Sequence, residues 1–359
     1  MNKFGKLGLM AAMTLTTLVG CAKSTSSDVD CPVRIGFVTD TGGIDDKSFN
    51  QGSWEGIKRF AEDNNIDSNC IKYMQSAGEA DYDPNLSTLA EEGMNLVIAA
   101  GYLFEEAMDA ASKKFPDTNF FVIDTVIDSP NVLSGTFNAE QSSYLVGMAA
   151  ALQAKAEGGD AVGFVGGVES ELISTFQAGF EQGVKAVDNN MKVMVDYAGA
   201  FDKPDTGKTL AEKQINAGAK VIYHAAGGTG SGVISNVVEH AKKGEKVWAI
   251  GVDRDQYEDG IYEVKNGDKT ETKSAILTSA MKKVDEATYQ ISKQILEGKF
   301  EGGKTISFDI NNGGVGIPET NPNLSEEIAE KINQAIQDMK DGKIKVDATK
   351  TMIKNGQVG

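Results

Sequence analysis

"NLVIAAG" at residues 95–101 and "KVIYHAAGG" at residues 220–228 are the two segments that decide the fold. In each, a short apolar run ends in glycine and is followed by a helical pattern. "FFVIDT" (120–125) and "VWAIGVDRD" (247–255) form a second matching pair, and both place an aspartate at the end of the apolar run. Strands that are apolar throughout are typical of parallel sheets with helices on both faces. The two halves of the chain are therefore predicted to have similar architecture.

The same alternation continues along the chain. Buried strands are predicted at 33–39, 95–100, 120–124, 161–165, 192–197, 221–224 and 246–252. Amphipathic helices are predicted at 51–64, 105–114, 141–155, 206–217 and 232–243. This pattern predicts an α/β fold of βαβ units, and 359 residues are too many for one typical core. Ligands bind at the carboxyl ends of strands in such sheets, so two facing domains predict a hinged binding protein with one cleft.

The first 20 residues have the pattern of a secretory signal: a basic start, a short apolar run and small residues before Cys21. "LVGC" (18–21) resembles a bacterial lipobox, in which the cysteine is acylated. The alternative is an ordinary signal with an incidental cysteine. We predict a lipoprotein signal peptide over 1–20, lipidation at Cys21 and a polar tether over 21–31. No later segment is long and apolar enough for a transmembrane helix, so the prediction is a cell-membrane protein, lipid-anchored on the extracytoplasmic face.

Charge and missing motifs exclude several classes of function. The chain has 35 basic and 52 acidic residues. Residues 1–20 contain two of the lysines and no acid, which leaves 33 against 52 and a net charge of −19. This charge argues against binding nucleic acid. His224 and His240 have no partner at metal-ligand spacing, nucleophile and Walker motifs are absent, and "GGTGSG" (227–232) lacks the dinucleotide spacing. We predict a binding protein without metal or cofactor, not an enzyme.

A resemblance to a known family gives these patterns a more definite meaning. "DTGGIDDKSFNQGSWEG" (40–56) and "ILTSAMKKVDEA" (276–287) closely resemble the basic membrane protein family, and the similarity extends from about residue 32 to 345. Members are lipoproteins with a type I periplasmic-binding-protein fold, known as purine-nucleoside receptors of ABC importers. The resemblance implies two doubly wound parallel-sheet domains joined by a three-segment hinge. A charged insertion at 256–274 departs from the family and is predicted to be a surface loop or hairpin.

The three-segment hinge implies domains that are not consecutive. The expected N-terminal domain comprises 32–137 and 279–305, and the expected C-terminal domain comprises 138–278 and 306–320. Crossings are expected near 137–140, 277–279 and 306–312. Residues 321–359 form a C-terminal helix and tail of unassigned domain, with the helix over 326–341 capped by Ser325.

A nucleoside presents a flat base, polar groups on its edge and ribose hydroxyls, so its site should supply aromatic rings and acceptors. Phe49 and Phe201 lie beside polar loop residues and are the expected stacking rings; the alternative is that they belong to the core. Asn50 and Asp124 are the expected readers of the base edge, although Asp124 could instead cap a helix. Asp40 is expected to order the first loop or to contact the ligand.

The ribose is assigned to a second group of residues. Asp253 is expected to accept hydrogen bonds from two ribose hydroxyls. Gly227 and Gly228 would let backbone N–H groups approach the sugar. Lys282, placed in an opening helix, is expected to pair with Asp253, with Lys283 as the competing choice.

Two cysteines remain after Cys21. Cys31 and Cys70 each precede a predicted strand, and the two strands are expected to be parallel neighbours, so a disulfide is predicted; the alternative is two free thiols.

The expected partners are a nucleoside of the adenosine, guanosine or inosine type and an ABC permease, with the protein itself a monomer. The rival functions are a binding protein for a sugar or another small polar ligand, a ligand-sensing surface lipoprotein, and a nucleoside hydrolase.

Overall fold

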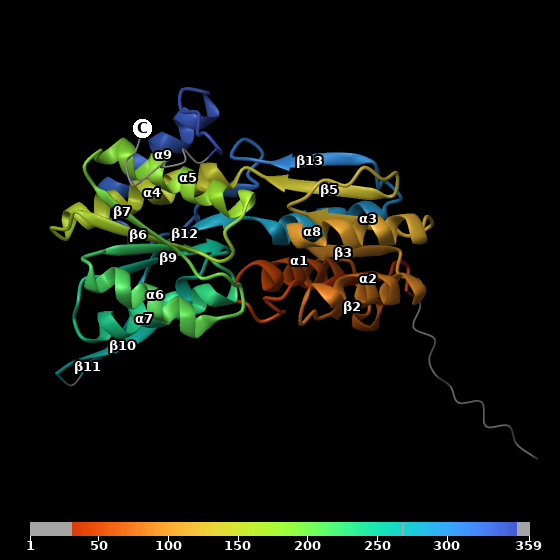
Figure 1. Cartoon of the computed structure of the whole chain (residues 1–359), viewed down its shortest axis with the longest axis horizontal. Helices are drawn as coiled ribbons and strands as arrows, with labels where there is room; N and C mark the ends of the chain where they lie inside the picture. The colour runs from red at the N-terminus through yellow and green to blue at the C-terminus, as the bar shows by residue number, and fades with distance from the viewer. Residues whose placement is uncertain (1–30, 268, 350–359) are drawn as a thin grey trace, which may run out of the picture. The chain divides into compact units, whose positions relative to one another are not determined.

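The computed structural model describes residues 31–267 and 269–349, and Figure 1 shows two main sheets in this part of the chain, besides a two-stranded hairpin. The predicted signal peptide, Cys21 and the tether as far as Asp30 lie outside the described residues. Each main sheet has six strands, in the orders β13-β5-β4-β3-β1-β2 and β14-β12-β9-β8-β6-β7. The pairings are parallel except for the short β14, which is antiparallel to β12. The predicted α/β class with two parallel sheets is confirmed.

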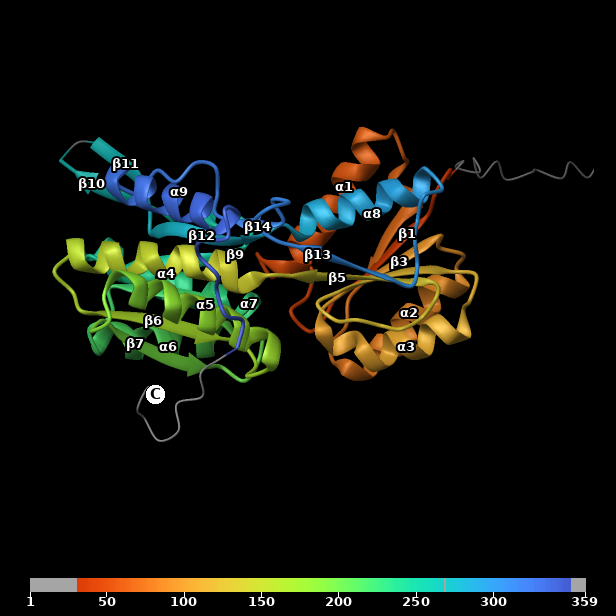
Figure 2. The same ribbon diagram turned by 90° about the horizontal axis from the view of Figure 1, so that it is seen from above.

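The first sheet and its helices form what we call the first lobe. Its strands are β1 (Ile35–Val38), β2 (Ile71–Met74), β3 (Leu96–Ala100), β4 (Asn119–Ile123), β5 (Val132–Phe137) and β13 (Lys304–Phe308). Its helices are α1 (Phe49–Asp63), α2 (Tyr82–Glu91), α3 (Glu105–Lys114) and α8 (Val284–Leu296). Helices α1 and α8 pack together over one face and α2 and α3 over the other, as Figure 2 shows.

The second sheet and its helices form the second lobe. Its strands are β6 (Ala161–Gly166), β7 (Lys192–Tyr197), β8 (Val221–Ala225), β9 (Trp248–Asp253), β12 (Ile276–Lys282) and β14 (Val315–Gly316). Its helices are α4 (Ala139–Ala156), α5 (Glu171–Val187), α6 (Pro204–Asn216), α7 (Gly228–Lys242) and α9 (Glu326–Lys340). Helices α4, α5 and α9 pack on one face, and α6 and α7 pack on the other.

The strand orders of the two lobes correspond position by position. β4 and β9 both stand third in their sheets, and β3 and β8 stand fourth. The central strands β3 and β8 are buried at every residue, as their apolar sequences predict. The aspartates that follow β4 and end β9 therefore occupy equivalent places, each at the carboxyl end of a strand.

Within the described residues the chain passes between the sheets three times. It leaves the first sheet after Phe137, leaves the second after Lys282, and leaves the first again after Phe308. The expected boundaries at 278/279 and 305/306 are wrong because they cut β12 and β13. Both strands are held to their ends by tertiary pairing: Met281 pairs with Asp253, and Phe308 pairs with Phe137.

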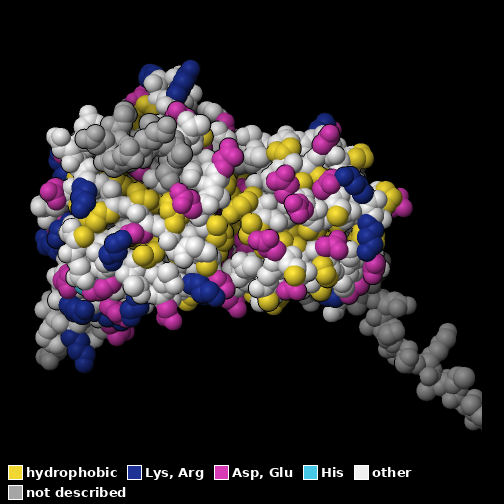
Figure 3. Space-filling view, in the orientation of Figure 1, with side chains coloured by type: hydrophobic (Ala, Val, Ile, Leu, Met, Phe, Trp, Pro, Cys, Tyr) yellow, Lys and Arg dark blue, Asp and Glu magenta, His cyan; other side chains and the backbone are white. Residues whose placement is uncertain are grey.

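The charged insertion is a hairpin of β10 (Ile261–Asn266) and β11 (Lys269–Ser274). α9 begins after Ser325, whose hydroxyl accepts a hydrogen bond from the N–H of Ile328, as predicted for its cap. Figure 3 shows acidic and basic side chains intermixed over the face in view. Among residues 31–267 and 269–349, no helix has the length and hydrophobicity needed to cross a membrane.

A disulfide joins Cys31 to Cys70, with the two Cα atoms 5.6 Å apart. Its position follows from the sheet, because β1 and β2 are parallel neighbours with Ile35 opposite Ile71. The cysteines precede these strands, at the amino ends, whereas ligands bind at the carboxyl ends in such sheets.

Candidate functional site

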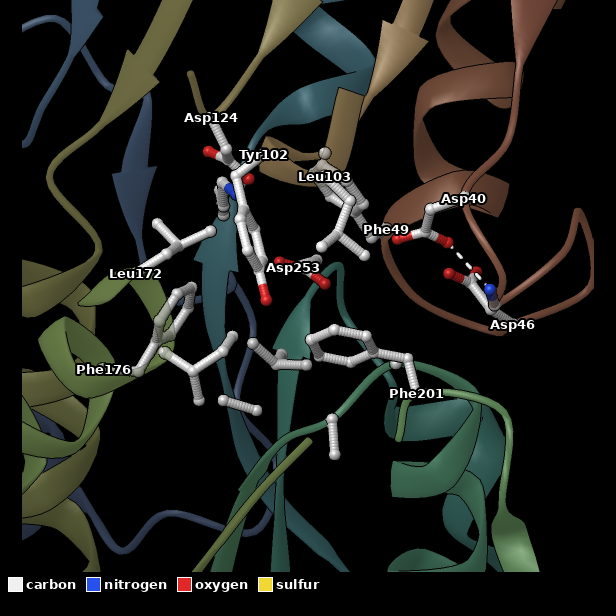
Figure 4. Close-up of a pocket in the computed structure, with 18 residues that line it drawn as sticks. Asp40, Asp46, Phe49, Tyr102, Leu103, Asp124, Leu172, Phe176, Phe201 and Asp253 are labelled. Atoms are coloured by element: carbon white, nitrogen blue, oxygen red, sulfur yellow. Dashed lines mark hydrogen bonds and ion pairs between the residues drawn. The ribbon is translucent and has the colours of Figure 1, made fainter. Parts of the chain in front are cut away.

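A cavity lies where the carboxyl ends of the strands in the two lobes meet, and residues of both lobes line it. The first lobe contributes Asp40, Gly42, Asp46, Phe49, Gly101, Tyr102, Leu103 and Asp124 to its lining. The second lobe contributes Leu172, Ile173, Phe176, Phe201, Ala225, Ala226, Gly227, Val252, Asp253 and Lys282. Figure 4 shows aromatic and acidic side chains directed into this space.

Asp124 and Asp253 line the cavity from equivalent places in the two sheets. Asp124 follows β4 with a φ of 71°, and Asp253 ends β9 with a φ of 66°. Positive φ is uncommon in residues other than glycine, although aspartate adopts it more readily than most. The shared strained backbone turns the chain at the end of each strand and places a carboxylate at the junction of the lobes.

Lys282 forms an ion pair with Asp124 and not, as expected, with Asp253. The helix expected at Lys282 is also absent, because this residue ends strand β12. The strand explains the choice of partner: Met281 is the residue opposite Asp253, so Lys282 extends one residue further and reaches the first lobe. The other carboxylate oxygen of Asp124, Oδ1, is buried and has no hydrogen-bond partner among residues 31–267 and 269–349. Lys283 does not line the cavity.

The hydroxyl of Ser48 donates a hydrogen bond to Asp253 across the junction of the lobes. Asp253 is 7% exposed, and burial raises the pKa of its carboxyl to about 6, while the nearby ammonium of Lys282 opposes that rise. The carboxyl is thus available to a ligand as an acceptor in a poorly solvated place.

The loop between β1 and α1 contains a second acidic pair, Asp40 and Asp46. The amide Nδ2 of Asn50 donates to Asp40 at 2.6 Å and to Asp46 at 3.0 Å, while its Oδ1 accepts from the N–H of Asp40. Asn50 is 1% exposed and does not line the cavity, so its expected contact with the base edge is not supported. Its amide is already used to hold the loop together.

Asp40 and Asp46 differ in their hydrogen-bond donors, although burial raises the pKa of both carboxyls. Asp46 accepts from the N–H groups of Ser48, Asn50 and Gln51 and so caps the start of α1. Both carboxyls line the cavity, but Asp40 accepts from fewer donors, Gly42 N–H and Asn50 Nδ2, and burial raises its pKa to about 7. Asp40 therefore both orders the loop and faces the ligand space.

Phe49 and Phe201, the expected stacking rings, both line the cavity. The ammonium of Lys282 lies 4.5 Å from the centre of the Phe49 ring. The Phe201 ring lies against Gly167, where an added Cβ would be 2.3 Å from ring atoms, so a residue without a side chain is needed there. Gly227 lines the cavity with a φ of 51°, whereas Gly228 begins α7 outside the lining.

Tyr102, Leu103, Leu172 and Phe176 were not predicted as site residues, although they line the cavity. In Figure 4 the Phe176 and Phe201 rings lie below Asp253 in the view, Phe176 to the left and Phe201 to the right. The only sequence signal for Tyr102 is its place directly after "NLVIAAG". No local signal marks Leu172 and Phe176, because their helix α5 was not predicted.

No group of three or more potential metal ligands is found in residues 31–267 and 269–349. The cavity lining offers instead four carboxylates, one ammonium and several rings. Such a lining suits a flat molecule that donates several hydrogen bonds.

Comparison with known proteins agrees with this architecture. Residues 33–350 match the family model "Bmp: ABC transporter substrate-binding protein PnrA-like". The chain belongs to this family. Its members are substrate-binding proteins, the class expected from the sequence.

Individual relatives and structures support the same assignment. The chain is 40% identical over 317 residues to the CD4+ T-cell-stimulating antigen of Listeria monocytogenes, covering 87% of each chain. It is 36% identical to the ABC transporter nucleoside-binding protein BmpA of Lactococcus lactis, covering 94% of this chain and 96% of the relative. A crystal structure of an ABC transporter solute-binding protein from Aeropyrum pernix is similar, with a TM-score of 0.77 and 25% identity over 88% of this chain and 93% of that chain. The predicted type I periplasmic-binding-protein fold is confirmed.

Proposed function

We propose that this protein captures a purine nucleoside in the cavity between its lobes and delivers it to an ABC permease. It acts as a monomer on the extracytoplasmic face, anchored through lipid on Cys21. The named nucleoside-binding relative, 36% identical along nearly the whole chain, supports the ligand class.

The observation that carries the proposal is the combination of rings and carboxylates in one cavity. Phe49 and Phe201 supply aromatic surface, while Asp40, Asp124 and Asp253 supply acceptors. A neutral nucleoside has a base that can stack and several N–H and O–H donors. A nucleotide would bring its phosphate charge close to these carboxylates, so it is expected to bind poorly.

Asp253 and Asp124 contact different parts of the ligand. Asp253 accepts from the ribose hydroxyls, while the unpartnered Oδ1 of Asp124 accepts from an N–H on the base edge. Gly227 allows close approach of the sugar at the turn after β8.

The decisive experiment is mass spectrometry of small molecules released by denaturing the purified protein, followed by calorimetry of the emptied protein. Inosine, guanosine and adenosine are titrated beside hypoxanthine, ribose and guanosine monophosphate. We expect a nucleoside to be released, and to bind about 100-fold more tightly than its base or sugar alone because both halves of the site contribute. Release of a sugar, or equal binding of ribose and inosine, would replace the proposal with the sugar-binding alternative.

A further inference from the structure

Gln256 is a fully buried glutamine just beyond β9 that is fixed in place within the second lobe. Its side-chain Oε1 accepts from the backbone N–H of Val252 at 2.8 Å, and its backbone N–H donates to Ser279 Oγ at 3.1 Å. A main-chain N–H can only donate, so the Val252 contact decides which way the amide is turned. An added Cβ at Gly251 would lie 2.8 Å from the glutamine side chain, so the glycine makes room for it.

The free end of this amide points into the other lobe. Gln256 Nε2 donates to the carbonyl oxygen of Lys47 at 2.9 Å. Lys47 belongs to the loop between β1 and α1 and has a φ of 60°, a left-handed conformation that costs a lysine free energy. The following residue, Ser48, is the donor to Asp253. Two successive residues of the first lobe thus hold the turn after β9 in the second.

The two residues joined by the Gln256 amide, Gln256 itself and Lys47, lie outside the ligand cavity. Lys47, Ser48 and Gln256 are all absent from the lining of the cavity, and Gln256 is 0% exposed. The bond from Gln256 to Lys47 nevertheless exists only while the lobes are together, because its two partners belong to different lobes. The affinity of a hinged protein depends on the fraction of molecules in the closed form as well as on the ligand contacts.

We infer that Gln256 is a positioning residue that latches the lobes closed by holding the Lys47 carbonyl, and so sets affinity without reading the ligand. The inference rests on the proposed function for its effect on affinity, but the latch itself operates in the empty protein. The cavity residues distinguish one ligand from another, whereas the latch changes the binding free energy by the same amount for every ligand that the closed cavity accepts.

The test replaces the side-chain NH₂ group of Gln256, which donates to Lys47 O. Gln256→Glu keeps the acceptor for Val252 N–H and replaces the donor that faces Lys47 with a second acceptor. We expect a larger radius of gyration of the empty protein in small-angle X-ray scattering. We also expect inosine and guanosine to bind about tenfold more weakly, by the same factor for both, with faster dissociation.

Gln214→Glu is the matched control. Gln214 is equally buried, and its amide donates to Phe164 O and Asp196 Oδ2, both within the second lobe. This variant should lose thermal stability without a change in radius of gyration or nucleoside affinity. Gln256→Met, uncharged and similar in size, replaces the first variant if the introduced carboxyl prevents folding.

The outcomes separate the latch from the proposed function. An unchanged radius of gyration in both Gln256 variants would overturn the latch, and so would a loss of affinity for one nucleoside only. If the wild-type protein binds no nucleoside, the proposed function fails, while scattering from the empty variants still decides whether Gln256 holds the lobes together.

Discussion

Asp124 and Asp253 occupy matching places in the two sheets and have left-handed backbones, yet their surroundings differ. Asp124 forms an ion pair with the ammonium of Lys282 from the opposite lobe, whereas Asp253 accepts a hydrogen bond from the uncharged hydroxyl of Ser48. The similarity comes from the repeated strand order, and the difference comes from which element crosses the junction. The repeated architecture thus gives the two carboxylates unequal partners. We expect Asp124 to matter more for stability and Asp253 to matter more for ligand binding.

The largest effect should come from removing the cation of the Asp124 pair. Both side chains are 2% exposed, so Lys282→Met leaves a carboxylate buried without a partner. Breaking a buried pair in this way costs about 3–5 kcal/mol. Thermal and urea unfolding would measure the loss, and nucleoside binding should fall as well. Adding Asp124→Asn should recover part of the stability, and an unchanged unfolding midpoint in the single variant would show that the pair is not formed.

Asp253→Asn should act chiefly on binding. The amide keeps the shape of the side chain, but its NH₂ end cannot accept from a hydroxyl. Hydrogen bonds to charged groups contribute about 1.5–3 kcal/mol, so calorimetry should show nucleoside affinity reduced by about tenfold to a hundredfold. Asp255→Asn, at an exposed site two residues later, is the control. Equal affinity in the Asp253 variant and this control would move the ribose site elsewhere.

A smaller effect is expected in the pH dependence of stability, to which the buried carboxyls of Asp40 and Asp253 contribute. Burial raises the pKa of Asp40 to about 7 and that of Asp253 to about 6, both above the ordinary value of 3.8. The folded chain therefore holds these protons more tightly than the unfolded chain. The stability they contribute is complete below about pH 4 and is lost as the pH rises through about 6 to 7.

The matching variant is Asp40→Asn in the ligand-free protein. Its melting temperature should exceed that of the wild type at about pH 7.5 and approach it at about pH 5, because the amide has no charge to bury. Asp45→Asn, exposed in the same loop, should follow the wild type at both values. Parallel curves for Asp40→Asn and the wild type would contradict the assigned pKa.

The smallest effect is expected for the exposed ion pair between the lobes. Arg254 Nη2 lies 3.9 Å from Glu55 Oε2, with the side chains 32% and 38% exposed. Solvent screens such pairs, which contribute about 0–1 kcal/mol. Arg254→Gln should therefore change nucleoside affinity by less than about fivefold, and less still in high salt. A loss as large as that of Asp253→Asn would mean that surface charge, and not the buried contacts, controls closure.

The sequence was informative where one local rule decides a position. Aspartates after apolar runs and glycines after strands led to Asp124, Asp253 and Gly227, because ligands bind at the carboxyl ends of parallel strands. The fold class, the α9 cap and the hairpin were predictable for similar reasons.

Positions that depend on tertiary contacts were not predictable in this way. "TSAMKK" has good helix-forming residues, yet it is extended because β12 pairs with β9 and β14, and this error gave Lys282 the wrong partner. Asn50 resembles a ligand contact in a polar loop, but its amide joins Asp40 to Asp46 once the loop has folded. Phe176 enters the cavity only because α5 is brought there by the packing of the second lobe.

The disulfide between Cys31 and Cys70 has a mechanical consequence. Tension on the chain before Cys31 reaches the start of β2 through a covalent bond, so it is shared between two neighbouring strands and does not peel β1 from the sheet alone. The load enters the first lobe at the amino ends of its strands, far along the sheet from the loop that closes on the second lobe. In the proposed lipid-anchored protein, force from the membrane would therefore load the amino ends of β1 and β2 and not the loop between β1 and α1 that contacts the second lobe.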